Sequence, residues 1–171
     1  MTDVHASAII GEAVKLGSGV SVGPFCVVDG EVALGDGVTL HSHVVVTGRT
    51  EIGAGTAIFP FAAIGHRPQD LKYAGEPSRI TIGSDCTLRE NVTVHPGTTG
   101  GGMHTSVGND CLLMAGTHVA HDCRIGDNVI IANGTGLAGH VQIDDYATLG
   151  GMVGVHQFVR IGKYAFVGGM T

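Results

Sequence analysis

Five of the ten histidines in this sequence could form one chemical site: His95, His118, His121, His140 and His156. Histidine exchanges protons near neutral pH and is also the commonest metal ligand, so grouped imidazoles indicate either acid–base chemistry or a metal centre. Single exposed histidines, by contrast, would be solvated and idle. The choice depends on whether the fold brings these five side chains together.

Six-residue repeats are the elements that must position these histidines. From Ala8 onward the third residue of each hexad is Ile, Leu or Val in 24 hexads, with interruptions at 66–79 and 98–104. Side chains alternate along a strand, so the first and third residues of a hexad point to one side. Gly, Asp, Asn and Ser at the last three positions suit a turn. A helix has a period of 3.6 and does not fit.

We therefore expect an all-β parallel β-helix with three short strands per 18-residue coil. About eight coils would form a prism about 40 Å long, as one domain over residues 1–171. Every third hexad then lies on the same face. Hexads 117–122, 135–140 and 153–158 share a face, and hexad 92–97 joins them if 98–104 loops out. This arrangement places the five histidines in one column, which favours a functional site.

Composition excludes several classes of protein. The chain has 171 residues, 29 of them glycine. Its 43% of apolar residues argues against disorder, and its net charge of −6 argues against a nucleic-acid partner. No apolar run approaches the ~20 residues of a membrane span, and the N-terminus does not resemble a signal peptide, so we expect a cytoplasmic protein. All four cysteines occupy the inward first position of a hexad and are expected to be reduced core thiols: Cys26, Cys86, Cys111 and Cys123.

The repeat resembles that of the hexapeptide-repeat acyltransferases, which implies a left-handed parallel β-helix and a homotrimer. The general rule for parallel crossovers would give a right-handed winding, so the expected hand rests on the resemblance. Four segments resemble one branch of that family, the UDP-N-acetylglucosamine 3-O-acyltransferases that begin lipid A synthesis. These segments are QDLKYAGEP (69–77), HVAHDC (118–123), AGH (138–140) and GMVGVHQF (151–158).

That resemblance implies direct transfer of a 3-hydroxyacyl group from acyl carrier protein to the sugar 3-hydroxyl, with no cofactor, metal or covalent intermediate. His121 would be the general base, Asp122 would orient it, and the Gly139 N–H would hold the oxyanion. The matching substrate contacts are Asp70, Lys72, His95, His118, His140, His156 and Gln157. Lys72 would pair with substrate phosphate, and Gly169 would set the acyl-chain length.

Other interpretations remain open. The acceptor could be a 3-amino sugar nucleotide, or the chain could be a non-catalytic, truncated β-helix. The γ-class carbonic anhydrases share the left-handed fold and bind zinc through three histidines. Their paired histidines lie five residues apart, whereas His118 and His121 lie three apart.

The two interruptions and the end of the sequence carry further expectations. Segment 66–79 holds Asp70, Lys72 and Tyr73 and is interpreted as a functional loop rather than a tolerated excursion. Segment 98–104 is either a lid or an inert bulge, and a functional contact is favoured. The family continues into a helical C-terminal domain that contacts the uracil, the diphosphate and the carrier protein. We expect that domain to be missing here.

Overall fold

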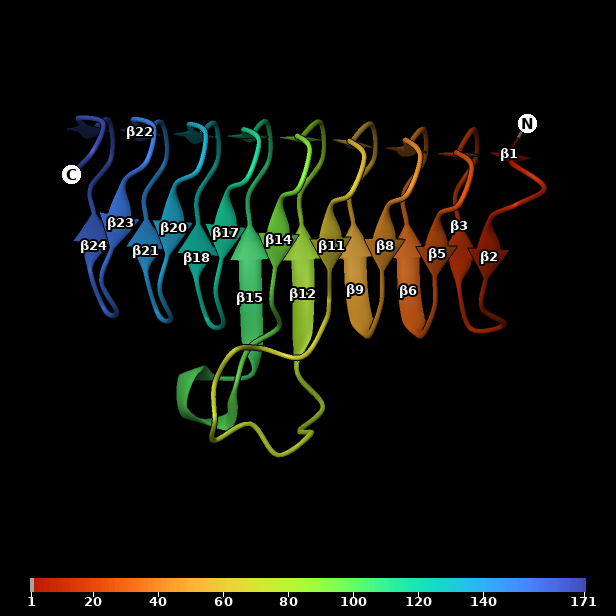
Figure 1. Cartoon of the computed structure of the whole chain (residues 1–171), viewed down its shortest axis with the longest axis horizontal. Helices are drawn as coiled ribbons and strands as arrows, with labels where there is room; N and C mark the ends of the chain where they lie inside the picture. Colours follow the sequence, from red (N-terminus) through yellow and green to blue (C-terminus); the bar gives the residue numbers. More distant parts are fainter. Residues whose placement is uncertain (1) are drawn as a thin grey trace.

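The computed structural model describes residues 2–171 and is a left-handed parallel β-helix whose coils lie side by side in a row (Figure 1). Three parallel sheets, called A, B and C here, form its faces. Sheet A contains β1 (Asp3–Val4), β4 (Ser21–Val22), β7 (Thr39–Leu40), β10 (Ala57–Ile58), β13 (Thr87–Leu88), β16 (Leu112–Leu113), β19 (Ile130–Ile131), β22 (Thr148–Leu149) and β25 (Phe166–Val167). Sheet B contains β2 (Ile9–Ile10), β5 (Val27–Val28), β8 (Val45–Val46), β11 (Ala63–Ile64), β14 (Thr93–Val94), β17 (His118–Val119), β20 (Gly136–Leu137) and β23 (Gly154–Val155). Sheet C contains β3 (Lys15–Leu16), β6 (Glu31–Leu34), β9 (Arg49–Ile52), β12 (Arg79–Ile82), β15 (His104–Val107), β18 (Arg124–Ile125), β21 (Gln142–Ile143) and β24 (Arg160–Ile161).

The register of the strands confirms the 18-residue coil. Ser21 pairs with Thr39, and His118 pairs with Gly136. The pairing spans a longer stretch of chain only where an insertion intervenes, as between Thr93 and His118. Both insertions therefore loop out of the helix without changing its frame.

The interior of the helix is aliphatic, as the hexad pattern predicts. Leu88, Leu113 and Ile131 are fully buried, and they belong to one continuous core of third-position side chains. The four cysteines are buried among them and unpaired. Each fully buried aliphatic side chain contributes roughly 1.5–3 kcal/mol, so the stacked interior is the main stabilising element of the coils.

The sixth residue of most hexads turns the corner in the left-handed backbone region. Asp122 (φ 61°) and His140 (φ 65°) are two of these corner residues. A non-glycine residue gives up about 1–2 kcal/mol in this conformation, which the packed interior on both sides offsets. Two residues of the candidate site are thus fixed by the turn geometry of the repeat.

The corner that leads from sheet C to sheet A carries a ladder of side-chain hydrogen bonds between coils. Asp36 accepts the Ser18 N–H at 2.7 Å, and Asp145 accepts the Asp127 N–H at 3.0 Å. The rungs between Asn109 and Ser84 and between Asp127 and Asn109 are equivalent. Each of these side chains therefore ties its own coil to the coil before it.

Both insertions leave the helix at the corner between sheets B and C, in neighbouring coils (Figure 1). The second insertion contains a single turn of 3₁₀ helix, η1 (Thr99–Gly101). Arg79 and His104 already belong to β12 and β15, so each insertion is one residue shorter at its end than the sequence predicted. Within residues 2–171 no helix has the length and apolarity that crossing a membrane requires.

Candidate active site

The predicted column of histidines is present on sheet B and on the corner that follows it. His118 lies in β17, His95 and His156 lie directly after β14 and β23, and His121 and His140 lie two and three residues after β17 and β20. These four strands are consecutive neighbours in sheet B. His66, which follows β11 in the same sheet, belongs to this face as well, and the sequence analysis missed it. Its signal was available, because hexad 62–67 precedes hexad 92–97 on that face once the first insertion is set aside.

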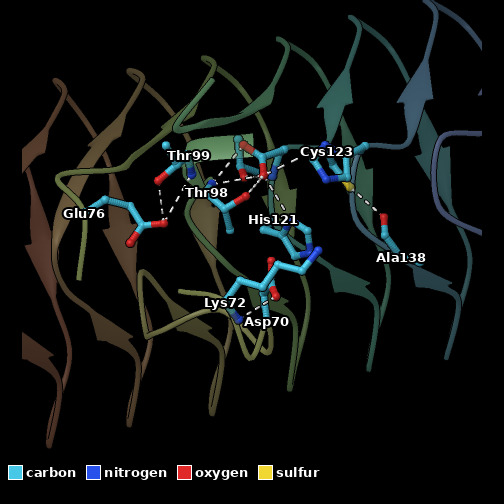
Figure 2. A network of polar contacts seen from close by, with 11 residues as sticks. Asp70, Lys72, Glu76, Thr98, Thr99, His121, Cys123 and Ala138 are labelled. Atoms are coloured by element: carbon cyan, nitrogen blue, oxygen red, sulfur yellow. Dashed lines mark hydrogen bonds and ion pairs between the residues drawn. The ribbon is translucent and has the colours of Figure 1, made fainter. Parts of the chain in front are cut away.

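His121 and Asp122 form a buried dyad at this corner. The His121 Nδ1–H donates to Asp122 Oδ2 at 2.9 Å, and both residues are buried (Figure 2). With the proton on Nδ1, the Nε2 atom keeps a free lone pair. The arrangement therefore leaves the imidazole able to accept a proton at Nε2 while a carboxylate stands behind Nδ1 to stabilise the imidazolium.

Two donors from Thr98, besides His121, hold the Asp122 carboxylate in place, and a hydrogen bond to Thr105 fixes its backbone. Its carboxylate accepts the Thr98 N–H at 3.0 Å and the Thr98 hydroxyl at 2.7 Å. Its own backbone N–H donates to the Thr105 hydroxyl at 2.8 Å. The Asp122 side chain is completely shielded from solvent, so hydrogen bonds take the place of water around this charge.

His140 lies edge-on to His121, one coil further along. The two ring centroids are 5.0 Å apart at 87°, and His140 Nδ1 is 4.0 Å from Asp122 Oδ2. Phe158 stacks on the other face of His140, with centroids 4.4 Å apart and an interplanar angle of 5°. These contacts fix the His140 ring beside the dyad.

Gly139 packs directly against the His121 ring. A Cβ atom at Gly139 would overlap the imidazole and stand only 2.5 Å from Nε2. The Gly139 N–H donates no hydrogen bond to another group within residues 2–171, whereas its carbonyl accepts from Phe158. A residue whose amide donor is not used elsewhere in the described chain therefore packs against the ring that carries the basic nitrogen.

His95 and His118 are neutral neighbours of the dyad. Burial first, and then the histidines around it, His118, His66 and His121, hold the pKa of His95 at about 4. Burial and His121 also lower the pKa of His118, whose Nδ1 is 2.7 Å from the Thr93 hydroxyl. The Nδ1 atom of His95 is buried without a hydrogen-bond partner. Both imidazoles are thus uncharged polar groups at neutral pH.

An open cavity of 560 Å³ lies along this face and receives the His121 ring. Its polar lining includes His118, His121, His156 and Gln157, together with Gln69 from the first insertion. A second hollow of 440 Å³ opens between that insertion and the corner, where Asp70 and Lys72 face His121 and His140 (Figure 2). The structure therefore brings together nine of the predicted residues around His121. The sequence analysis did not assign Gln69 or Phe158, which also line these hollows.

Gly169 does not join this group. It follows β25 of sheet A, on a different edge of the prism, and packs against the backbone of Gly151. Within one copy of the chain Gly169 therefore does not contact His121, and its role in setting the acyl-chain length stays a prediction.

A metal ion has one possible set of ligands among the described residues: His121, Asp122 and His140, whose ligand atoms lie within 4.8 Å of one another. The Asp122 oxygens already accept hydrogen bonds from Thr98 and His121. The carboxylate of this set is therefore satisfied by protein donors, and the set is not the three-histidine set of the zinc alternative.

Comparisons with known proteins point in one direction. The family model "Bacterial transferase hexapeptide (six repeats)" matches residues 13–48 and 104–139. An acyl-[acyl-carrier-protein]–UDP-N-acetylglucosamine O-acyltransferase from Rickettsia peacockii is 52% identical over 123 residues, which are 72% of this chain and 47% of that protein. The chain thus spans about half the length of the curated relatives it matches.

Solved structures agree with this similarity. The UDP-N-acetylglucosamine acyltransferase from Francisella novicida superposes with a TM-score of 0.93 at 43% identity, covering 97% of this chain and 60% of the other. The enzyme of the same name from Campylobacter jejuni gives 0.95 at 35% identity, covering 99% and 66%. The similarity therefore includes both insertions and every coil that carries the histidine column.

Proposed function

This chain belongs to the hexapeptide family of bacterial transferases, and we propose that it transfers a 3-hydroxyacyl group from acyl carrier protein to the 3-hydroxyl of UDP-N-acetylglucosamine, the first step of lipid A synthesis. The observation that carries the proposal is the His121–Asp122 dyad, whose imidazole packs against Gly139 at an open cavity, with the Gly139 N–H unused by other described groups. A base and an oxyanion donor are the two groups that acyl transfer requires.

The chemistry follows from those two groups. His121 Nε2 removes the proton from the sugar hydroxyl while the oxygen attacks the thioester carbonyl carbon. The Gly139 N–H stabilises the oxyanion as the C–O bond forms. The C–S bond then breaks, and the imidazolium returns its proton to the departing thiolate. No enzyme nucleophile is needed, and the four cysteines are buried in the core and are not among the described residues that line the cavity.

The surrounding side chains are proposed to bind the substrates. Lys72, on the first insertion, lines the same hollow as His121 and is placed to pair with a substrate phosphate. Asp70 accepts the Lys72 N–H at 2.9 Å, which fixes that part of the loop. The rings of His118 and His140, with His156 and Gln157, line the two hollows as hydrogen-bonding groups for the sugar and the acyl chain. His95 supports His118 from behind, with ring centroids 4.9 Å apart.

The assembly and the partners are part of the same proposal. Large apolar side chains remain exposed near the C-terminal coils, among them Phe158, Phe166 and Met170. Burying such side chains against other copies supports a homotrimer, in which Gly169 would border the groove for the acyl chain. With these partners, the proposed location of the reaction is the cytoplasm.

A transfer assay with 3-hydroxyacyl carrier protein and UDP-N-acetylglucosamine tests this function. We expect His121→Ala to lower kcat by roughly 10²–10⁴-fold, the usual contribution of a general base, while the melting temperature shows that the coils remain folded. His5→Ala, an exposed histidine in the first coil, is the matched control. Normal turnover by His121→Ala would refute the assignment of the base.

Two further measurements separate the alternative functions. The same assay with a 3-amino sugar nucleotide as acceptor distinguishes ester from amide formation. Calorimetry with UDP-N-acetylglucosamine distinguishes an enzyme from a non-catalytic β-helix, since only the enzyme is expected to bind the nucleotide sugar.

A further inference from the structure

The second insertion closes directly over the carboxylate of Asp122. It occupies the coil that precedes His121, and Gly97 just before it and Gly101 within it lie so close that a Cβ atom on either would overlap the Asp122 side chain. Gly100, between them in the turn, has open space around it. The segment is therefore fitted to Asp122 at specific positions and is not a passive bulge.

Thr98 supplies most of the hydrogen bonds that orient this carboxylate. Asp122 Oδ2 accepts the Thr98 hydroxyl, shares the Thr98 N–H with Oδ1, and also accepts the His121 Nδ1–H. These donors fix the rotation of the carboxylate group about its Cβ–Cγ bond. Because Oδ2 then points at His121 Nδ1, the imidazole proton is held there and Nε2 is left free.

Glu76 ties the second insertion to the first. Its Oε1 atom accepts the Thr99 N–H at 3.2 Å and the Thr99 hydroxyl at 3.0 Å (Figure 2). Its Oε2 atom accepts the Ala74 N–H at 2.8 Å. Hydrogen bonds from the backbone and from Thr99 lower the pKa of Glu76 to about 2, so the carboxylate stays charged throughout the neutral range. The loop that carries Asp70 and Lys72 is thereby fastened to the segment that holds Asp122.

We propose that the second insertion is a positioning device in which Thr98 sets the orientation of Asp122, and through it the tautomer of His121, while Glu76 latches the device to the substrate loop. The catalytic consequence rests on the proposed function. The structural consequence, the position of the proton on His121, does not depend on it.

Nitrogen-15 NMR of the histidine rings tests the structural consequence directly. We expect the Nδ1–H tautomer of His121 to dominate in the wild type and to lose its dominance in Thr98→Val, which keeps the shape of the side chain and removes the hydroxyl donor. Thr98→Ser restores the donor and should restore the tautomer. Gly101→Ala should disturb the tautomer, whereas Gly100→Ala should leave it as in the wild type.

Kinetics test the catalytic consequence. Loss of a hydrogen bond to a charged group at this site should lower kcat by roughly tenfold in Thr98→Val with little change in KM. Glu76→Ala should lower kcat and raise KM together, because it frees both insertions. This variant also tests the proposal if Thr98→Val does not fold.

The outcomes separate the two proposals. A wild-type tautomer and wild-type kcat in Thr98→Val and Gly101→Ala would overturn the positioning role even in an active transferase. A protein without transfer activity, whose His121 tautomer nevertheless responds to Thr98→Val and recovers in Thr98→Ser, would confirm the positioning role and refute the proposed function.

Discussion

Gly139→Ala should move the proposed base without removing the proposed oxyanion donor. The backbone of Gly139 is not in the left-handed region, so alanine is compatible with it and the N–H is kept. The new Cβ would stand 2.5 Å from His121 Nε2, whereas ordinary contact begins at 3.4 Å. The ring must therefore retreat by about 1 Å. Misplacement of a reacting group by that distance costs on the order of 10²-fold in rate, or about 3 kcal/mol of barrier.

The transfer assay and thermal melting together check this expectation. Gly162→Ala is the matched control, because its Cβ meets open space on sheet C, away from the cavity. We expect Gly139→Ala to lower kcat about 100-fold with an unchanged melting temperature, and Gly162→Ala to change neither. A Gly139→Ala variant with wild-type kcat would refute the claim that position 139 must be glycine because a side chain there displaces His121.

Two other predictions concern stability. Burial holds the pKa of His95 at about 4 in the folded chain, against about 6.5 in the unfolded chain. As the pH falls, the unfolded state binds the proton first. The contribution of neutral His95 to the free energy of unfolding is complete above pH 6.5 and should decline by up to about 3 kcal/mol as the pH reaches 4. Urea unfolding of His95→Gln should show a smaller decline. Leu113 is fully buried whereas its neighbour Leu112 is partly exposed. Leu113→Ala should therefore lower the free energy of unfolding by about 2–5 kcal/mol, and Leu112→Ala by clearly less. Equal losses would contradict the inward direction of the third hexad position.

The repeat allowed the coils and the histidine column to be predicted because both follow from short-range periodicity. The alternation within each hexad determines that Leu113 points inward, and the 18-residue period determines that His118 and Gly136 are neighbours. The burial of Asp122 was not predictable in this way. It depends on the second insertion, whose path has no repeat to constrain it.

The supporting residues were missed for the same physical reason. Thr98 and Glu76 lie in non-repetitive loops, and their partners, Asp122 and Thr99, come from other coils or from the other insertion. Such contacts are set by how two excursions meet in space. Only the Gly-rich composition of segment 98–104 hinted that something had to fit closely beside it.

The ladder of Asp and Asn side chains between sheets C and A has a consequence for folding. The hexads present similar side chains to the aliphatic interior. A coil that slipped by six residues would therefore bury a similar amount of apolar surface. The rungs made by Asp36, Asn109, Asp127 and Asp145 form only in the correct threading, at roughly 1 kcal/mol each. A slipped coil would set these side chains against the wrong edge of the prism and lose their bonds. The ladder thus distinguishes the native register of the coils from slipped registers in which the apolar interior would be equally well buried.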